Sequence, residues 1–381
     1  MLTTTKLYDI FHIVNGEHSD PHTVLGMHEM EEDGRKAVVV RAFLPNAAGI
    51  TVIDYANKRK KYPMERLHAD GFFEVTIADR EEWFRYQLEY TDADGNTWRS
   101  YDPYSFSPTL SEFDRHLFGA GTHYEIYEKM GGRLMTHEGA RGAAFSVWAP
   151  NAKAVSVIGD FNNWDARRSP MRRLGESGIW ELFLPAAAED KYKFHVTQCD
   201  GRVVDKTDPY GVYAEVRPNN ASVLYPLKRY KWKDRRWMTA RRKYDFRTAP
   251  MNIYEVHLGS WKRAEGDRFL TYTELAEQLI PYVKEMGYTH VELHPVMGYL
   301  DEEAGPYSTF SYYAPNRRYG VPEDFARLVN ELHKENIGVI LDWTPAHFPR
   351  HGEGLERFDG TPLYEIPDPA MAVHPMWGTL L

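Results

Sequence analysis

The sequence predicts a multidomain protein with two tandem antiparallel β-sandwiches, followed by a parallel sheet in which strands and helices alternate. Three observations support this fold class. Two segments within the first 225 residues resemble each other, and both alternate apolar and polar residues with a period of two. After Asp245 the pattern changes to alternating strands and helices. A chain of 381 residues is long enough for two or three domains with a sizeable core.

The internal repeat is defined by three dipeptides that recur in the same order. Pro45-Asn46 matches Pro150-Asn151, Pro63-Met64 matches Pro170-Met171, and Asp102-Pro103 matches Asp208-Pro209. In each copy, short alternating runs such as AVSVIGD and IWELFL are separated by glycine-containing turns, which is typical of an antiparallel sandwich. We place the two sandwiches at residues 1–120 and 121–230. We expect a short helix within residues 124–135 to link them and to end at Gly131-Gly132.

The third domain, residues 231–381, begins with a strand, helix, strand, helix, strand pattern. Strands are expected within residues 251–261, 289–296 and 338–343, and helices within 271–288 and 321–338. Thr271 and Glu274 have the spacing of a capping box, and Pro322 suits a first helical position. Such units form a parallel sheet, either open or closed into an eight-stranded barrel. In both, ligands bind at the carboxyl ends of strands, which draws attention to Asp342 at the end of the third strand.

Composition excludes some classes of partner. The net charge of −9 argues against nucleic acid and anionic membranes, which need a positive face. The basic stretch at residues 228–237 is interpreted as a solvated linker. No apolar run reaches the length of a membrane span or a signal peptide, and the single cysteine, Cys199, allows no intrachain disulfide, so we expect a cytoplasmic protein. The 14% of aromatic residues fits either core packing or exposed platforms for sugar rings.

The second repeat carries a motif that the first lacks. It reads GDFNNWDARRSPM where the first copy has IDYANKRKKYPM, and in this it resembles a carbohydrate-binding module of family 48. The resemblance implies that Trp164, Lys193 and Asn219 contact glucan. Such modules often have a second aromatic residue after their Asp-Gly turn, where this chain has Val203. Two interpretations stay open: the module binds glucan, or it only braces the next domain.

Further motifs in the third domain, taken in order, resemble the glycogen branching enzymes of glycoside hydrolase family 13. The motifs are YEVHLGSW, THVELHPV, GVILDW followed by PAHFP, RFDGTPLYE and HPMWGTLL. The resemblance implies a TIM-type (β/α)8 barrel and an α-1,4-glucan substrate such as glycogen or amylose. We expect no cofactor, and no metal either, because Pro349 lies between His347 and His351 and forbids a clean helical metal pair. The resemblance also implies that the enzyme cleaves an α-1,4 link by a retaining covalent mechanism and transfers the chain to a C6 hydroxyl.

The same resemblance assigns roles to three residues. Asp342 supports the surroundings of the nucleophile, His347 bonds sugar hydroxyls, and Tyr307 stacks on the same sugar ring. Around Tyr307 the chain reads GPYS, where the family typically has WGYQ.

The family's catalytic Asp, Glu and Asp are expected beyond Leu381. An eight-stranded barrel needs roughly 250 residues, whereas residues 251–381 carry about three strands, so we expect a truncated barrel that is inactive alone. One alternative is a complete, non-catalytic glucan-binding protein that uses Trp164. Another is an α/β enzyme of a different reaction type that uses Asp342 and His347, for which no nucleophile or phosphate loop is evident. The oligomeric state is left open, with a monomer among the options, and so is the transferred chain length.

Overall fold

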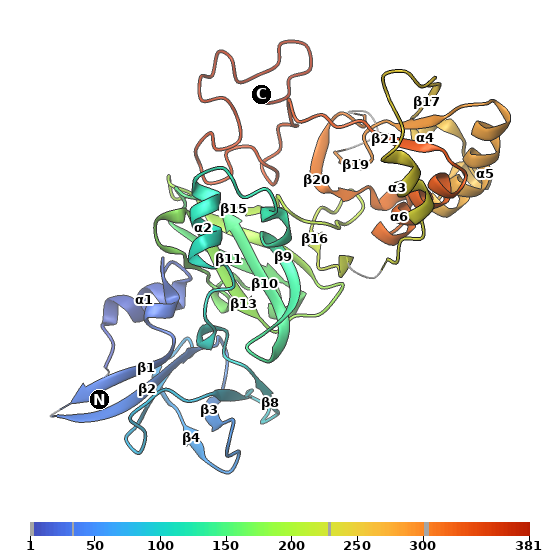
Figure 1. Ribbon diagram of the computed structural model, residues 1–381. Helices are drawn as coiled ribbons and strands as arrows, with labels where there is room; N and C mark the ends of the chain where they lie inside the picture. The colour runs from blue at the N-terminus through green and yellow to red at the C-terminus, as the bar shows by residue number, and fades with distance from the viewer. Residues whose placement is uncertain (1–3, 33, 228–229, 301–304) are drawn as a thin grey trace. The chain divides into compact units, whose positions relative to one another are not determined.

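The computed structural model describes residues 4–32, 34–227, 230–300 and 305–381. The chain divides into two compact units. The first comprises Met1–Asp208 and Arg357–Thr361, and the second comprises Pro209–Glu356 and Pro362–Leu381. Figure 1 shows the antiparallel sheets of the first unit in blue to green and the helix-containing part of the second in yellow to red.

The first repeat forms two antiparallel four-stranded sheets. The first sheet has the order β1 (Gly26–Glu32), β2 (Arg35–Phe43), β6 (Phe72–Ile77), β5 (Glu65–His68). The second sheet has the order β4 (Lys61–Pro63), β3 (Gly49–Asp54), β7 (Tyr86–Thr91), β8 (Thr97–Ser100). Alternate residues of both sheets share one buried cluster, which includes Val40 of β2, Val52 of β3 and Leu88 of β7. The period-two pattern therefore directs apolar side chains of both sheets into a common core.

In the second repeat, one sheet has the strand order of its counterpart, and the other keeps the order of β3, β7 and β8. One sheet runs β12 (Arg172–Arg173), β13 (Ile179–Leu184), β10 (Ala140–Trp148), β9 (Gly131–His137), and the other runs β11 (Ala154–Gly159), β14 (Lys191–Thr197), β15 (Val203–Lys206). A matching hydrogen bond marks the end of each copy. The Tyr86 hydroxyl donates to Asp102 Oδ2 at 2.5 Å in the first copy, and the Tyr192 hydroxyl donates to Asp208 Oδ2 at 2.5 Å in the second. The sequence repeat is thus a structural repeat, and its Asp-Pro dipeptides hold buried tyrosines.

The predicted linker helix at residues 124–135 is wrong. Only Ile126–Glu128 is helical, as a single 3-10 turn, and Gly131 begins β9. The backbone N–H of Gly132 donates to Asp208 Oδ2 at 2.9 Å, so this glycine pair starts a strand rather than ending a helix. Two helices that the pattern did not predict, α1 (Leu7–Asn15) and α2 (Glu112–Gly119), flank the repeats.

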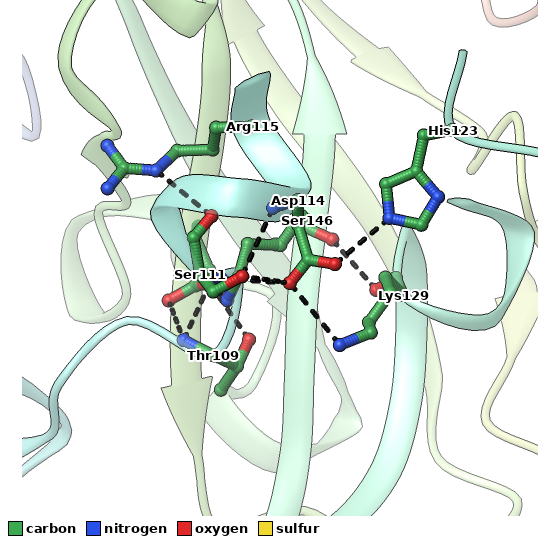
Figure 2. Close-up of polar contacts among 9 residues, drawn as sticks. Thr109, Ser111, Asp114, Arg115, His123, Lys129 and Ser146 are labelled. Carbon is green, nitrogen blue, oxygen red and sulfur yellow. Dashed lines mark hydrogen bonds and ion pairs between the residues drawn. The ribbon is translucent and has the colours of Figure 1, made fainter. Parts of the chain in front are cut away.

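Helix α2 is held by a network of polar side chains (Figure 2). Its N-cap Ser111 forms a capping box with Asp114, and Asp114 also accepts from His123 Nε2 at 2.9 Å and Lys129 Nζ at 3.3 Å. Burial alone would raise the pKa of Asp114, but the hydrogen bonds from His123 and Ser111 hold this pKa below its ordinary value. Asp114 is therefore an ionised anchor for the helix.

A segment distant in sequence completes the first unit. In Arg357–Thr361, Phe358 and Asp359 are fully buried. Asp359 Oδ2 accepts from the Asn151 backbone N–H at 2.9 Å and from Asn151 Nδ2 at 3.0 Å. The Asp359 carbonyl accepts from the backbone N–H of Cys199 at 3.0 Å. Gly360 has a φ of +94°, and a Cβ there would lie 2.9 Å from the Cys199 sulfur, so only glycine fits.

The second unit contains the predicted parallel sheet. Its strands are β17 (Ile253–Val256), β18 (His290–Leu293) and β21 (Gly338–Leu341), in that order. Helices α5 (Tyr272–Glu285) and α6 (Pro322–Lys334) connect them, and their apolar stripes share a core with the strands. The capping box of Thr271 with Glu274 and the start of α6 at Pro322 are confirmed. The predicted order, antiparallel sheets first and a strand–helix part after them, is therefore confirmed.

The remaining elements are short. In the second unit they are α3 (Arg235–Arg241), α4 (Leu258–Trp261), β16 (Ser222–Val223), β19 (Met297–Tyr299) and β20 (Thr309–Pro315). Further 3-10 turns lie at Pro21–Thr23, Pro103–Ser105, Asp160–Asn162, Ala166–Arg168, Gly175–Ser177, Glu265–Asp267 and Arg317–Tyr319. The predicted linker at 228–237 falls partly outside the described residues, and its last residues open α3. No helix in the described part of the chain has the length and apolar character needed to cross a membrane.

Candidate functional site

The carboxyl ends of the three parallel strands place polar side chains at one edge of the sheet. Val256, Leu293 and Leu341 are paired in register, so the next residues along the chain are His257, His294 and Asp342. The pairing continues for one more step, because Asp342 N donates to Leu293 O at 2.9 Å. Asp342 therefore lies directly after the third strand, as predicted.

Tyr307 and Asp342 are brought together. The Tyr307 hydroxyl donates to Asp342 Oδ2 at 2.7 Å, while the Tyr307 ring stays 41% exposed. This hydrogen bond, together with burial, raises the pKa of Tyr307 to about 12, and the negative charges of Glu255 and Glu292 add to the rise. The Tyr307 phenol is thus protonated at neutral pH, and its hydrogen bond to Asp342 orients the tyrosine ring beside the edge of the sheet.

Glu255 and Glu292 were not singled out from the sequence. They face each other across β17 and β18, one residue before the strand ends. The signal that could have found them is their identical position in YEV and VEL, both within predicted strands.

His347 belongs to a separate aromatic cluster. Only 7% of the residue is exposed, and its ring lies 5.0 Å from Trp377 and 6.4 Å from His374 between centroids. Burial lowers the pKa of His347, and His374 lowers it further, so the imidazole is neutral near pH 7. Within the described residues, the His347 ring forms no hydrogen bond or ion pair with Asp342 or Tyr307. The predicted trio is therefore only partly assembled by direct contacts.

In the first unit, Trp164 and Lys193 flank the end of β11. Lys193 on β14 pairs with Ile158, and the backbone N–H of Trp164 donates to Gly159 O at 3.0 Å. Asp160 links Trp164 to the start of β14, because its carboxylate accepts from Trp164 Nε1 at 3.1 Å and from Lys191 N at 2.9 Å. The indole is held in one orientation yet remains 40% exposed.

The GDFNNW turn that presents Trp164 is built by Asn162. Its amide donates to Val157 O at 2.9 Å and to Ser169 Oγ at 3.0 Å, and its oxygen accepts from Gly159 N at 2.9 Å. This buried amide is therefore occupied by the protein and does not face a ligand. The next residue along, Asn163, is exposed.

Asn219 belongs to the second compact unit. It is exposed, in a segment fixed by its neighbours: Arg217 Nε donates to Leu300 O at 2.9 Å, and the Asn220 amide donates to Glu353. At the position where a second aromatic would be expected, Val203 begins β15 and is exposed. Among the residues that the structure describes, no group of His, Cys, Asp and Glu side chains could hold a metal ion.

Three family models match the chain. Residues 6–104 match the N-terminal domain of alpha-1,4-glucan branching enzyme GlgB, residues 129–211 match carbohydrate-binding module 48 (isoamylase N-terminal domain), and residues 256–358 match the alpha amylase catalytic domain. In the order of the chain, a region similar to carbohydrate-binding module 48 therefore precedes a region similar to the alpha amylase catalytic domain.

Individual relatives are more specific than the family models. The chain is 45% identical to the 1,4-alpha-glucan branching enzyme GlgB of Thermosynechococcus vestitus over 99% of its own length and 52% of that protein's. It is 46% identical to the enzyme of the same name from Rhodospirillum rubrum, over 97% of this chain and 50% of that one. The resemblance to the glycogen branching enzymes is therefore confirmed, and the chain spans about half the length of the curated relatives it matches. Among solved structures, a type I pullulanase from Bacillus subtilis aligns with 89% of this chain and 49% of its own, at 20% identity and a TM-score of 0.48.

Proposed function

We propose that the chain is the glucan-holding part of a 1,4-alpha-glucan branching enzyme of glycogen biosynthesis. The complete reaction cleaves an α-1,4 link of glycogen or amylose and transfers the chain to a C6 hydroxyl by a retaining covalent mechanism. In this proposal two tandem β-sandwiches, residues 1–120 and 121–230, precede the first three strands of a (β/α)8 barrel, residues 231–381. The ranges matched by the family models fall inside these boundaries. The single cysteine, Cys199, suits a cytoplasmic protein.

The observation that carries the glucan-binding role is the backbone of Trp164. Its φ is +61° and that of Asn163 is +57°, so two consecutive non-glycine residues lie in the left-handed region. A bulky residue there is under strain, and strain of this kind persists where the surroundings impose it and clusters at functional sites. Here the strain presents a large flat indole to solvent, where the face of a sugar ring can stack on it. Lys193, at the same strand end, can donate to sugar hydroxyls.

At the sheet edge of the second unit, we assign substrate contacts rather than bond cleavage to the predicted residues. Tyr307 is held by Asp342 with its ring half exposed, which suits stacking on a sugar. A neutral His347 has one ring nitrogen that donates and one that accepts, and this matches the hydroxyls of a glucan. We assign the nucleophile and the acid/base to no described residue. The isolated chain is therefore expected to bind glucan without turnover.

Affinity electrophoresis in gels that contain glycogen tests the binding role. The chain should be retarded by glycogen, and Trp164→Ala should migrate much closer to its position in a glycogen-free gel. Trp83→Ala is the matched control, since Trp83 is also a half-exposed tryptophan of the first unit but lies outside the GDFNNW turn. If Trp164→Ala is retarded as strongly as the wild type, the module serves as a brace and the glucan role of Trp164 is wrong.

A further inference from the structure

A hollow lined by aromatic and polar side chains lies in the first unit. It is a cavity of about 140 Å³ between the first repeat and the GDFNNW region of the second. Residues that line it include Tyr90, Trp98, Ser100, Asp102, Phe161 and Arg168. A single buried water needs only about 10–15 Å³ by a comparable measure, so the cavity has room for a group the size of one hexose ring.

One wall of the cavity is an aromatic platform. Trp98 of β8 is paired with Tyr90 of β7, and their rings stack with centroids 5.5 Å apart and planes at 23°. Trp98 nevertheless remains 41% exposed. A tryptophan supported on one face by another ring and open on the other presents a fixed apolar surface, which suits the C–H face of a pyranose.

The polar groups around this platform are donors that can form further hydrogen bonds. Within the described residues, the hydroxyls of Tyr90 and Ser100 form no hydrogen bond, and the Arg168 guanidinium reaches only Asn162 O, at 3.4 Å. Burial raises the pKa of Tyr90, so its hydroxyl keeps its proton. By contrast, Asp102 is already engaged, because it accepts from the Tyr86 hydroxyl at 2.5 Å and from Tyr104 N at 3.0 Å.

This combination selects the class of ligand. A buried carboxyl in the lining disfavours an anion such as a phosphate, and a single arginine offers no pair of cations to offset it. Neutral hydroxyl groups can use the hydroxyls and the guanidinium without introducing charge. We propose that the cavity binds one glucosyl unit of an α-glucan through stacking on Trp98, as a carbohydrate site separate from Trp164. The inference rests on the proposed function only for the identity of the sugar.

Calorimetric titration of the full chain with maltotriose tests the proposal. The wild type should show two sites in the first unit that respond separately to substitution. Trp98→Ala should weaken one of them by roughly tenfold, because it removes the stacking surface, and Trp164→Ala should weaken the other. Trp83→Ala, a tryptophan of similar exposure outside both sites, should leave the titration unchanged.

The outcomes separate this inference from the proposed function. If Trp98→Ala titrates like the wild type while Trp164→Ala loses binding, the cavity is not a sugar site but the glucan role of the module stands. If the wild type binds no maltotriose, both fail. Should Trp98→Ala lose its near-ultraviolet circular dichroism, Tyr90→Phe replaces it. That change keeps the stack and removes a hydroxyl that bonds no described residue, so unchanged binding by Tyr90→Phe would then overturn the proposal.

Discussion

The buried carboxylate of Asp359 offers a test of how the first unit is held together. Asp359 is fully buried, and its two oxygens accept four hydrogen bonds. Oδ2 takes the two from Asn151, which is 208 residues away in sequence, and Oδ1 takes the backbone N–H and the hydroxyl of Thr361 at 3.1 and 2.6 Å. Asp359→Asn keeps the size of the side chain but replaces one acceptor oxygen by an NH2 donor.

The expected loss follows from those contacts. In its better orientation the asparagine oxygen faces Asn151, and its NH2 group faces Thr361. The Thr361 hydroxyl can rotate to accept, but the Thr361 backbone N–H is left without a partner. Losing this hydrogen bond to a charged group and leaving its partly buried donor without a partner together cost about 1.5–3 kcal/mol. We therefore expect the free energy of unfolding of the first unit to fall by about 1.5–3 kcal/mol.

Urea unfolding followed by tryptophan fluorescence measures this change, because Trp180 is buried in β13 of the same unit. The two compact units can unfold separately, so the transition that contains Trp180 is the one to compare. Asp200→Asn is the matched control. Asp200 is an exposed carboxylate in a turn, bonded to Arg202, and its replacement should leave the transition unchanged. If Asp359→Asn unfolds with the same midpoint and slope as the control, the segment 357–361 does not stabilise the unit and this reasoning is refuted.

Three further predictions concern titrating groups. The pKa of Asp114 is depressed in the folded state, so its stabilising contribution is present above the ordinary pKa of about 3.9 and is lost as the pH falls through the lower, folded pKa. As the pH is lowered from about 7 to about 2, the melting temperature should therefore fall less steeply for Asp114→Asn than for the wild type. An identical slope would contradict the role of the network. NMR of labelled tyrosine should give Tyr307 a pKa of about 12, and Asp342→Asn should move this pKa towards the ordinary value of about 10. An unchanged pKa would show that the hydrogen bond is absent in solution. His347 should titrate below its ordinary pKa, mainly because it is buried, so His374→Ala should raise its pKa only in part; a full return to about 6.5 would contradict the dominance of burial.

The elements that the sequence predicts well are those with local signals. The capping box at Thr271, the proline at the start of α6 and the strand that ends just before Asp342 are each specified by residues within one turn or one strand. The repeated Asp-Pro dipeptides also mark equivalent places, because each aspartate bonds a tyrosine sixteen residues earlier in its own copy.

Other features depend on contacts that no local pattern encodes. Asp359 lies in the RFDGTPLYE stretch, but its partner Asn151 is 208 residues away. The Gly131-Gly132 pair looks like a helix end until Asp208, 76 residues later, supplies the acceptor for Gly132. Asn162 and Asn163 are adjacent and chemically identical, and only the fold turns one inward and leaves the other exposed. No local pattern encodes either that His347 packs against Trp377, apart from the hydrogen bond between Tyr307 and Asp342.

Under the proposed function, this chain holds α-glucan, and none of the residues that the structure describes supplies the nucleophile or the acid/base. The most direct measurement is proton NMR of amylose incubated with the wild-type chain, in which α-1,6 linkages appear as resonances separate from those of α-1,4 linkages. We predict that the amylose signals broaden on binding and that no α-1,6 resonance grows with time. Steady growth of an α-1,6 resonance that scales with the concentration of the chain would contradict the account, because the described residues would then have to supply the nucleophile and the acid/base.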